Sequence, residues 1–477
     1  MCSSSIVSND LAKIELKLTL RRAGVLLVLL VAAGMFVQLS GVVTLAASVL
    51  GLPAERIGLD AVALLTPRKI ATAVVFAIVA AAAWGLLRRD ACGRLLAGIP
   101  PLTADAAGLF RIALAMALLW ALLVEGPVHP GLNPDLVRPA GPLASWSWAT
   151  ALAVRESATI WIHYSLVALV VILAIGLFTR TVTVMLAAVA TLNAIVLLQR
   201  QSAHDWGLPV VTLWLLTIVP WGDAYSVDAA MRRRSGAPPP VRDAAQYGLA
   251  IWIPGVALGL AFLAAAFAKM DATGISWITE GAVRYHFVED SRHAPVDWGL
   301  RIAASDVLSR LFSLGAVVVE SVIIVHVLAR TWRVRLAFGL VAASLLLGFF
   351  LFQGVFWRLW WTLLVAFLPW PRQQPQQHPH AWLPRWQVAV IAAFVLQQVV
   401  FSSLHLEMEP LISDYGMYSF SFPSKEAFDR HLANKLRRVR VEQTPQGPRT
   451  IAEEPVFDWE RGQFGPPRLI YDFRPER

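Results

Sequence analysis

Long apolar runs dominate the chain and limit what it can fold into. Each run is close to the roughly 20 residues that a helix needs to cross the hydrocarbon core of a bilayer. The runs cover residues 23–50, 70–87, 106–124, 158–178, 181–199, 208–222, 248–268, 309–329, 336–352, 356–370 and 386–403. They predict an all-α polytopic transmembrane helix bundle of roughly 10–11 helices.

The composition excludes several classes of protein. The 477 residues are 57% hydrophobic and only 15% charged, whereas a soluble domain is about one quarter charged. An ordinary soluble enzyme and a disordered or fibrous protein are therefore excluded. The net charge of +9 is typical of cytoplasmic loops that face anionic lipid, so the predicted partner is a lipid bilayer and no nucleic acid is expected. The two cysteines, Cys2 and Cys92, cannot form a disulfide framework or a zinc cluster, and no metal is expected.

Basic clusters recur at alternate connections between the predicted helices. They are Arg21–Arg22, Arg88–Arg94, Arg180, Arg232–Arg234 and Arg330–Arg335. If the helices alternate in direction, all five clusters lie on one side, which the positive-inside rule assigns to the cytoplasm. The first apolar run follows basic residues and is too long for a signal peptide, so we interpret it as an uncleaved anchor. These features predict a bacterial-type inner membrane protein with a cytoplasmic N-terminus and an external C-terminus.

Changes in composition divide the chain into four parts. Residues 1–100 are predicted as an N-terminal extension with two transmembrane helices, and residues 101–371 as the main membrane domain. Residues 372–403 hold a solvated linker and the last transmembrane helix. Residues 404–477 are predicted as an external C-terminal appendage.

The appendage has a mixed pattern of helix and strand signals. Residues 417–422 alternate like a strand, and Ser424 is a plausible cap for a short helix that ends at Leu436. Residues 439–441 and 469–473 predict further strands. The sequence therefore predicts a small α+β fold for this segment.

Two ionisable residues lie in or next to apolar runs, where charge is costly. Glu320 is apolar on both sides, so its carboxylate must be protonated or paired within the bundle; a structural hydrogen bond and a functional role are both open. Lys269 ends an apolar run and is followed by Asp271. It is either an anchor at the membrane interface or, if buried, a base. His326 is close to the basic cluster at Arg330, and we expect it to extend toward the interface.

A third polar group lies at a turn between two predicted helices. It contains Arg200, His204 and Asp205, and it falls on the same predicted external side as Lys269. Histidine titrates near neutral pH and can position a proton. A solvated turn is the alternative. His286, His293, Glu289 and Asp290 are residue types that bind metals, but they lack a metal-binding spacing.

Several short segments resemble the HTTM superfamily, the membrane domain of vitamin K-dependent gamma-carboxylases and many bacterial proteins. The carrying segments are Gly176–Arg180, Arg200–His204, Pro220–Asp228 with its Ser-Val-Asp element, Ala268–Asp271 and Trp277–Gly281. Glu320 falls where the family places an acid in the following helix. The resemblance spans about residues 105–370, just over half of the chain.

The resemblance implies a reaction and roles for three residues. In the carboxylases, the lysine of the corresponding element deprotonates reduced vitamin K, and oxygen-dependent epoxidation then drives removal of a glutamate γ-proton before CO2 adds. Carried over, Lys269 would be the base, His204 a polar partner and Glu320 a buried acid. The implied cofactor is a reduced vitamin K-type quinone, and the implied substrate is a secreted peptide.

The chain also departs from the carboxylase pattern. The histidine and asparagine that carboxylases carry in the helix after the acid are missing here, where Gln353 is the polar side chain of residues 346–356. The tail is too short for the lumenal domain that docks a carboxylase substrate. Two alternatives therefore stay open: a non-catalytic membrane partner for maturation of, or immunity to, a secreted peptide, and a proton-coupled transporter that uses Glu320. The sequence does not indicate an oligomeric state.

Overall fold

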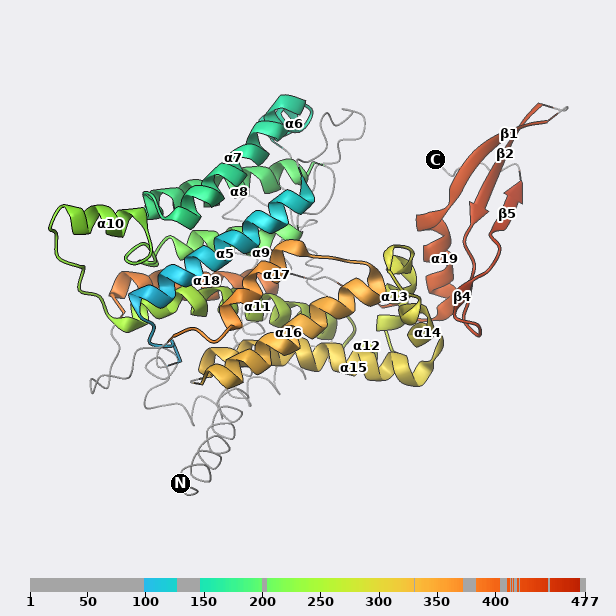
Figure 1. Cartoon of the computed structure of the whole chain (residues 1–477). Coiled ribbons are helices and arrows are strands. Elements are labelled where there is room, and N and C mark those ends of the chain that lie inside the picture. Colours follow the sequence, from blue (N-terminus) through green and yellow to red (C-terminus); the bar gives the residue numbers. More distant parts are fainter. Residues whose placement is uncertain are drawn as a thin grey trace, which may run out of the picture. The chain divides into compact units, whose positions relative to one another are not determined.

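The computed structural model describes residues 98–126, 146–199, 204–329, 331–371, 383–403 and most of 410–471 (Figure 1). Within the last range, residues 412, 414, 416, 417, 420, 445 and 446 are not described. The predicted helices at 23–50 and 70–87 lie outside the described residues, and so does most of the predicted linker after Pro371.

The described chain is mainly helical. Its helices are α5 (Ala104–Glu125), α6 (Ser147–Ala153), α7 (Glu156–Ile175), α8 (Thr179–Leu197), α9 (His204–Leu216), α10 (Val227–Arg234), α11 (Ala244–Thr273), α12 (Ser276–Thr279), α13 (Val283–Asp290), α14 (Trp298–Ala304), α15 (Asp306–Val322), α16 (Trp332–Gln353), α17 (Arg358–Leu363), α18 (Arg385–Ser403) and α19 (Lys425–Leu436). Three short 3₁₀ segments are η4 (Ser291–His293), η5 (Ile323–Leu328) and η6 (Leu364–Phe367).

Six of these helices are long and apolar enough to cross a membrane. They are Ala104–Glu125, Glu156–Ile175, Thr179–Leu197, Ala244–Thr273, Asp306–Leu328 and Trp332–Gln353. Each overlaps an apolar run that the sequence predicted as a transmembrane helix. The chain is therefore a multi-pass membrane protein with a helical bundle.

Two predicted transmembrane helices are shorter than their apolar runs. The run at 208–222 contains α9, which has 13 residues and gives way to turns that precede Pro220. The run at 356–370 contains α17 followed by η6, so its backbone leaves the α-helical conformation after Leu363. The run at 386–403 forms α18, which is not among the six spanning helices. Apolar composition alone did not show where α9 and α17 end.

Two compact units make up the described chain. Unit 1 contains residues up to 267, 320–343 and 357–416, and unit 2 contains residues 268–319, 344–356 and 417–477. In unit 1, α5 packs on α7, α7 on α8 and α8 on α9, while α17 contacts both α5 and α9 (Figure 1).

Local signals set the ends of the helices in unit 1. The Thr103 hydroxyl accepts a hydrogen bond from the Ala106 amide and begins α5. Gly176 ends α7 in the left-handed conformation, with φ of +74°, where a Cβ atom would lie 2.5 Å from the Ser226 side chain. This close approach brings the end of α7 against the segment that precedes α10.

Unit 2 has a core of aromatic and aliphatic side chains from helices and tail together. Trp277, Tyr285, Phe287, Phe428 and Phe457 are all buried in one cluster. The Ser424 hydroxyl accepts a hydrogen bond from the Ala427 amide at 3.2 Å, which caps α19 as predicted. The tail therefore shares its core with α12, α13 and α14.

The tail also forms two small antiparallel sheets. The strands are β1 (Arg438–Thr444), β2 (Gly447–Glu454), β3 (Phe457–Asp458), β4 (Gln463–Phe464) and β5 (Arg468–Tyr471). One sheet has the order β1-β2-β5, and the other pairs β3 with β4 (Figure 1). The strand predicted at 417–422 does not form at the described residues of that segment. No described strand pairs with it, and an unpaired strand lacks the hydrogen bonds that would stabilise it.

Candidate functional site

Lys269 is buried near the end of α11. Only 2% of the residue is exposed, and its Nζ atom lies 5.5 Å from the centroid of the Trp277 ring on α12. The electron-rich face of an indole attracts a cation, and the attraction grows where water is excluded. The alternative in which Lys269 anchors the helix in interfacial water does not fit this burial.

Aromatic side chains continue from Lys269 through unit 2. The Trp277 ring stacks on the His286 ring at 6.4 Å, and His286 meets Tyr418 edge to face at 5.1 Å. Tyr418 in turn stacks on Phe349 at 5.7 Å. We call these five residues the Lys269 cluster. Its members come from α11, α12, α13, α16 and the segment before α19, so only the tertiary structure assembles it.

The indole of Trp277 brings a polar N–H group into the Lys269 cluster. The Trp277 Nε1 atom is buried and makes no hydrogen bond with the residues that the structure describes. A buried donor without an acceptor costs about 1–3 kcal/mol. An oxygen atom of a bound ligand would satisfy this donor.

Two neighbouring acids, the buried Glu289 and the partly buried Asp290, lie at the end of α13. Glu289 forms an ion pair with Lys435 and lies 3.5 Å from the His431 Nε2 atom. Burial, together with the charge of Glu289, raises the pKa of Asp290 to about 6. Burial and the charges of these two carboxylates also raise the pKa of the Tyr418 hydroxyl. Within the described residues, no group of three or more His, Cys, Asp or Glu residues is arranged to hold a metal ion.

His204 lies at the start of α9, next to Asp205 of the same predicted polar group. The His204 carbonyl accepts a hydrogen bond from Trp360 Nε1 at 3.0 Å. The adjacent Asp205 accepts one from the Leu359 amide at 3.2 Å. Burial raises the pKa of Asp205 to about 7, and the charge of Glu125 adds to that shift. Glu125 itself accepts a hydrogen bond from Trp206 Nε1 at 3.3 Å.

Glu125 is an acid near Asp205 that the sequence did not predict as part of the polar group of His204 and Asp205. Glu125 is the last residue of α5, and Asp205 belongs to the first turn of α9. A signal was present, because both acids occur at the ends of apolar runs, where charge has to be explained. Their proximity depends on the packing of α5 and α9 around α17.

Glu320 is buried in the last turn of α15. Only 1% of the residue is exposed, and the helix changes to the 3₁₀ form at Ile323, three residues later. Short 3₁₀ stretches within long helices often mark hinges. The transporter alternative requires an intramembrane acid of this kind.

The expected position of His326 was wrong. His326 is fully buried and does not extend toward the interface: its Nδ1 atom bonds to the Ile323 carbonyl at 2.8 Å, and its ring packs on Phe367 at 4.8 Å. Gly255 makes room for this ring, since a Cβ atom there would lie 2.2 Å from the His326 Nε2 atom. The backbone bend of η5 places the ring against α11.

The three predicted site residues do not all belong to the same unit. Lys269 belongs to unit 2, and His204 and Glu320 belong to unit 1. The nearby Arg200 lies outside the described residues.

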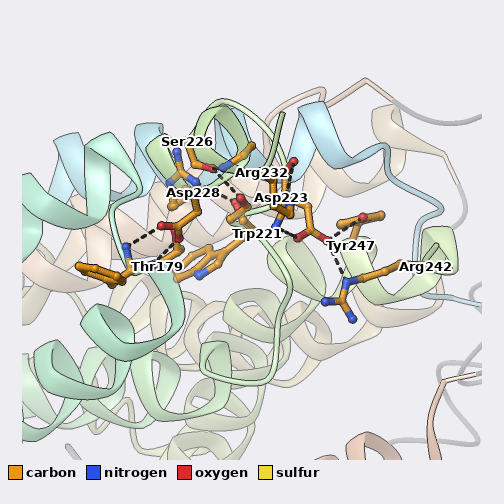
Figure 2. A network of polar contacts seen from close by, with 12 residues as sticks. Thr179, Trp221, Asp223, Ser226, Asp228, Arg232, Arg242 and Tyr247 are labelled. Atoms are coloured by element: carbon orange, nitrogen blue, oxygen red, sulfur yellow. Dashed lines mark hydrogen bonds and ion pairs between the residues drawn. The ribbon is translucent and has the colours of Figure 1, made fainter. Parts of the chain in front are cut away.

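A separate polar network lies where α8, α10 and α11 begin (Figure 2). The two Asp228 carboxylate oxygens accept hydrogen bonds from the Phe178 amide, the Thr179 amide and the Thr179 hydroxyl at 2.7–2.8 Å. The Ser226 hydroxyl caps α10 by accepting from the Ala229 amide at 2.9 Å. Asp228 therefore stabilises the start of α8 from across the network.

Asp223 is the second acid of this network. Its carboxylate binds Arg242 Nε and the Tyr247 hydroxyl at 2.8 and 2.9 Å, and Arg232 lies at 3.3 Å (Figure 2). Arg111, buried in α5, donates to the carbonyls of Trp221 and Tyr225. These contacts fold the segment between Pro220 and Asp228 against three helices.

Comparisons of the chain with protein-family models, with curated proteins and with solved structures give no match.

Proposed function

We propose that the protein is an inner membrane enzyme that modifies a secreted peptide, with Lys269 as the base that accepts a proton from a reduced vitamin K-type quinone. The single observation that carries the proposal is the burial of Lys269 against the Trp277 ring. A base for a lipid-soluble quinol has to work away from bulk water and next to surfaces that accept a flat ring. The Lys269 cluster provides an amine among aromatic side chains.

The residues of the cluster fit such a cofactor in one further respect. The unpartnered Trp277 Nε1 donor would bind an oxygen of the quinone, which would orient the ring system close to Lys269. A bound quinone supplies oxygen-dependent redox chemistry that amino-acid side chains cannot supply. In this proposal, the chain's own task is to hold the ring, exclude water and accept the proton at Lys269 Nζ.

The test is oxygen-dependent epoxidation of a reduced naphthoquinone by the full-length protein in detergent. We expect epoxide from the wild type and none from Lys269→Ala or Lys269→Arg, because the arginine keeps the charge but is not deprotonated in proteins. Lys425→Ala is the matched control: Lys425 also lies over a tryptophan, at 5.2 Å from the Trp459 ring, but 35% of its side chain is exposed. This control should keep full activity.

A second variant tests the orienting role of the indole. Trp277→Phe retains a ring and removes the N–H donor, so the proposal expects about a tenfold loss of kcat/KM. Absence of epoxide from folded wild-type protein would remove the assignment of Lys269 as a naphthoquinol base. The non-catalytic membrane partner would then be the preferred function, and both Lys269 variants would support maturation of the peptide.

A further inference from the structure

A cleft opens beside the Asp223 network in unit 1. Its volume is about 290 Å³, and it is bounded by the start of α8, the turn at 217–223, α10, the start of α11 and the start of α18. It is lined by charged and aromatic side chains, namely Arg180, Arg232, Arg242, Asp223, Asp228 and Trp386. None of these residues belongs to the Lys269 cluster.

The cleft carries an excess of positive charge. Three arginines face two aspartates, and both aspartates already bind donors of the protein. Asp228 accepts three hydrogen bonds at the start of α8, and Asp223 is bound by Arg232, Arg242 and Tyr247. The two carboxylates are therefore occupied, while donors of the arginines remain for a ligand.

The remaining donors can be named. Arg180 is exposed and makes no hydrogen bond or ion pair with other described residues. Arg242 uses its Nε atom on Asp223, which leaves its two terminal nitrogens (Figure 2). Guanidinium groups with free donors on one cleft are well suited to a phosphate, whose oxygens accept paired hydrogen bonds.

A buried hydrogen-bond acceptor in the wall of the cleft indicates a second chemical group that the ligand has to carry. Gln387 is 2% exposed; its Nε2 atom donates to the Ile218 carbonyl at 2.9 Å, but its buried Oε1 atom has no partner among the described residues. An unpaired buried acceptor is costly, and a hydroxyl donor on the ligand would relieve that cost. The half-exposed indole of Trp386 beside it is the type of side chain that lies at the level of lipid headgroups.

We propose that this cleft binds a phosphate ester that carries a hydroxyl group, as in the glycerol phosphate headgroup of phosphatidylglycerol. The phosphate contacts Arg180 and the terminal nitrogens of Arg242, and the hydroxyl donates to Gln387 Oε1. The same chemistry exists in free glycerol phosphate, so the two sources have to be separated by experiment. Basic pockets between transmembrane helices are known to bind anionic headgroups in this way.

The test counts lipids bound to the full-length protein by native mass spectrometry from an equimolar mixture of phosphatidylglycerol and phosphatidylcholine. We expect the wild type to retain phosphatidylglycerol preferentially. In Arg180→Gln, the preference for phosphatidylglycerol over phosphatidylcholine should be about tenfold weaker. Arg180 is exposed and makes no hydrogen bond or ion pair with other described residues, so we expect its substitution to leave the fold intact. Arg233→Gln is the matched control, since Arg233 is an exposed arginine of α10 that does not line the cleft.

Two further experiments test whether the ligand is a lipid or a soluble phosphate ester, and whether its hydroxyl group binds to Gln387. Glycerol phosphate that displaces phosphatidylglycerol, or that binds in its place with the same dependence on Arg180, supports the site with a soluble ligand. Gln387→Leu should lower the preference for phosphatidylglycerol over phosphatidate about fivefold. The proposal is overturned if neither phosphate ester binds, if Arg180→Gln binds as the wild type does, or if Gln387→Leu leaves the preference unchanged.

Discussion

Asp205 shows how one partly buried carboxyl can make stability depend on pH. Its Oδ1 atom accepts a hydrogen bond from the Leu359 amide, which holds the start of α9 against the start of α17. Burial raises its pKa from 3.8 to about 7, so the folded chain retains a proton that the unfolded chain releases. Between these two values the folded state binds more protons, and stability from this group falls as pH rises.

We expect Asp205→Asn to raise the thermal midpoint of the detergent-solubilised protein at pH about 8 and to change it little at pH about 4. The asparagine retains an oxygen for the Leu359 amide and cannot ionise. The measurement is thermal unfolding at both pH values, with Asp105→Asn, a change at an exposed aspartate of α5, as the control. An equal shift of the midpoint at both pH values would show that Asp205 does not titrate in this window.

At the scale of elements, glycines on α11 set how closely it approaches η5. Gly255 and Gly259 are one turn apart on α11. A Cβ atom on Gly259 would lie 2.7 Å from the Cα atom of Ile324, which is backbone and cannot rotate away. Small residues at this spacing let helix backbones pack closely inside a membrane.

Gly259→Ala should therefore destabilise the protein by about 1–2 kcal/mol, since the overlap outweighs the gain in helix propensity of about 1 kcal/mol. Gly315→Ala on α15 is the matched control, because no atom of the described residues outside its own stretch of helix lies within 4 Å of the added Cβ, and it should be neutral or stabilising. Thermal unfolding in detergent measures both variants. A Gly259→Ala protein as stable as the wild type would mean that α11 and η5 separate without cost.

At the scale of the whole molecule, the distribution of arginines predicts which side of the membrane each connection faces. The exposed stretch after α10 follows Arg232–Arg234, and the positive-inside rule predicts that it is cytoplasmic. The same alternation predicts that the C-terminal tail is external. Both statements can be tested on exposed residues that the structure describes.

We expect a membrane-impermeant maleimide to label Glu460→Cys in intact spheroplasts and Ala237→Cys only after the membrane is opened. Both positions are exposed, and Cys2 and Cys92 are replaced by serine beforehand. A membrane-permeant maleimide, which should label both variants, controls for reactivity. The reverse pattern of labelling would contradict the proposed orientation.

The helix bounds that were predicted from local sequence patterns agree closely with the structure. The run at 106–124 became Ala104–Glu125, and the helix that Ser424 caps ends at Leu436 as expected. Both depend on neighbours within a few residues, namely an unbroken apolar stretch and a hydroxyl that accepts from a nearby amide. The strand β2 was missed, because it forms by pairing with β1 on one side and with β5 on the other.

The apolar runs alone identify a multi-pass helical membrane protein, because the length of an apolar run is a local property that sets whether a helix can span the bilayer. The sequence also marked Lys269 and Glu320 as charges that needed an explanation. The tertiary structure decided the surroundings of each charge. Burial beside Trp277, the raised pKa of Asp205 and the enclosed ring of His326 all depend on packing between chain segments. The exclusion of water by distant segments is not encoded in any short stretch of sequence.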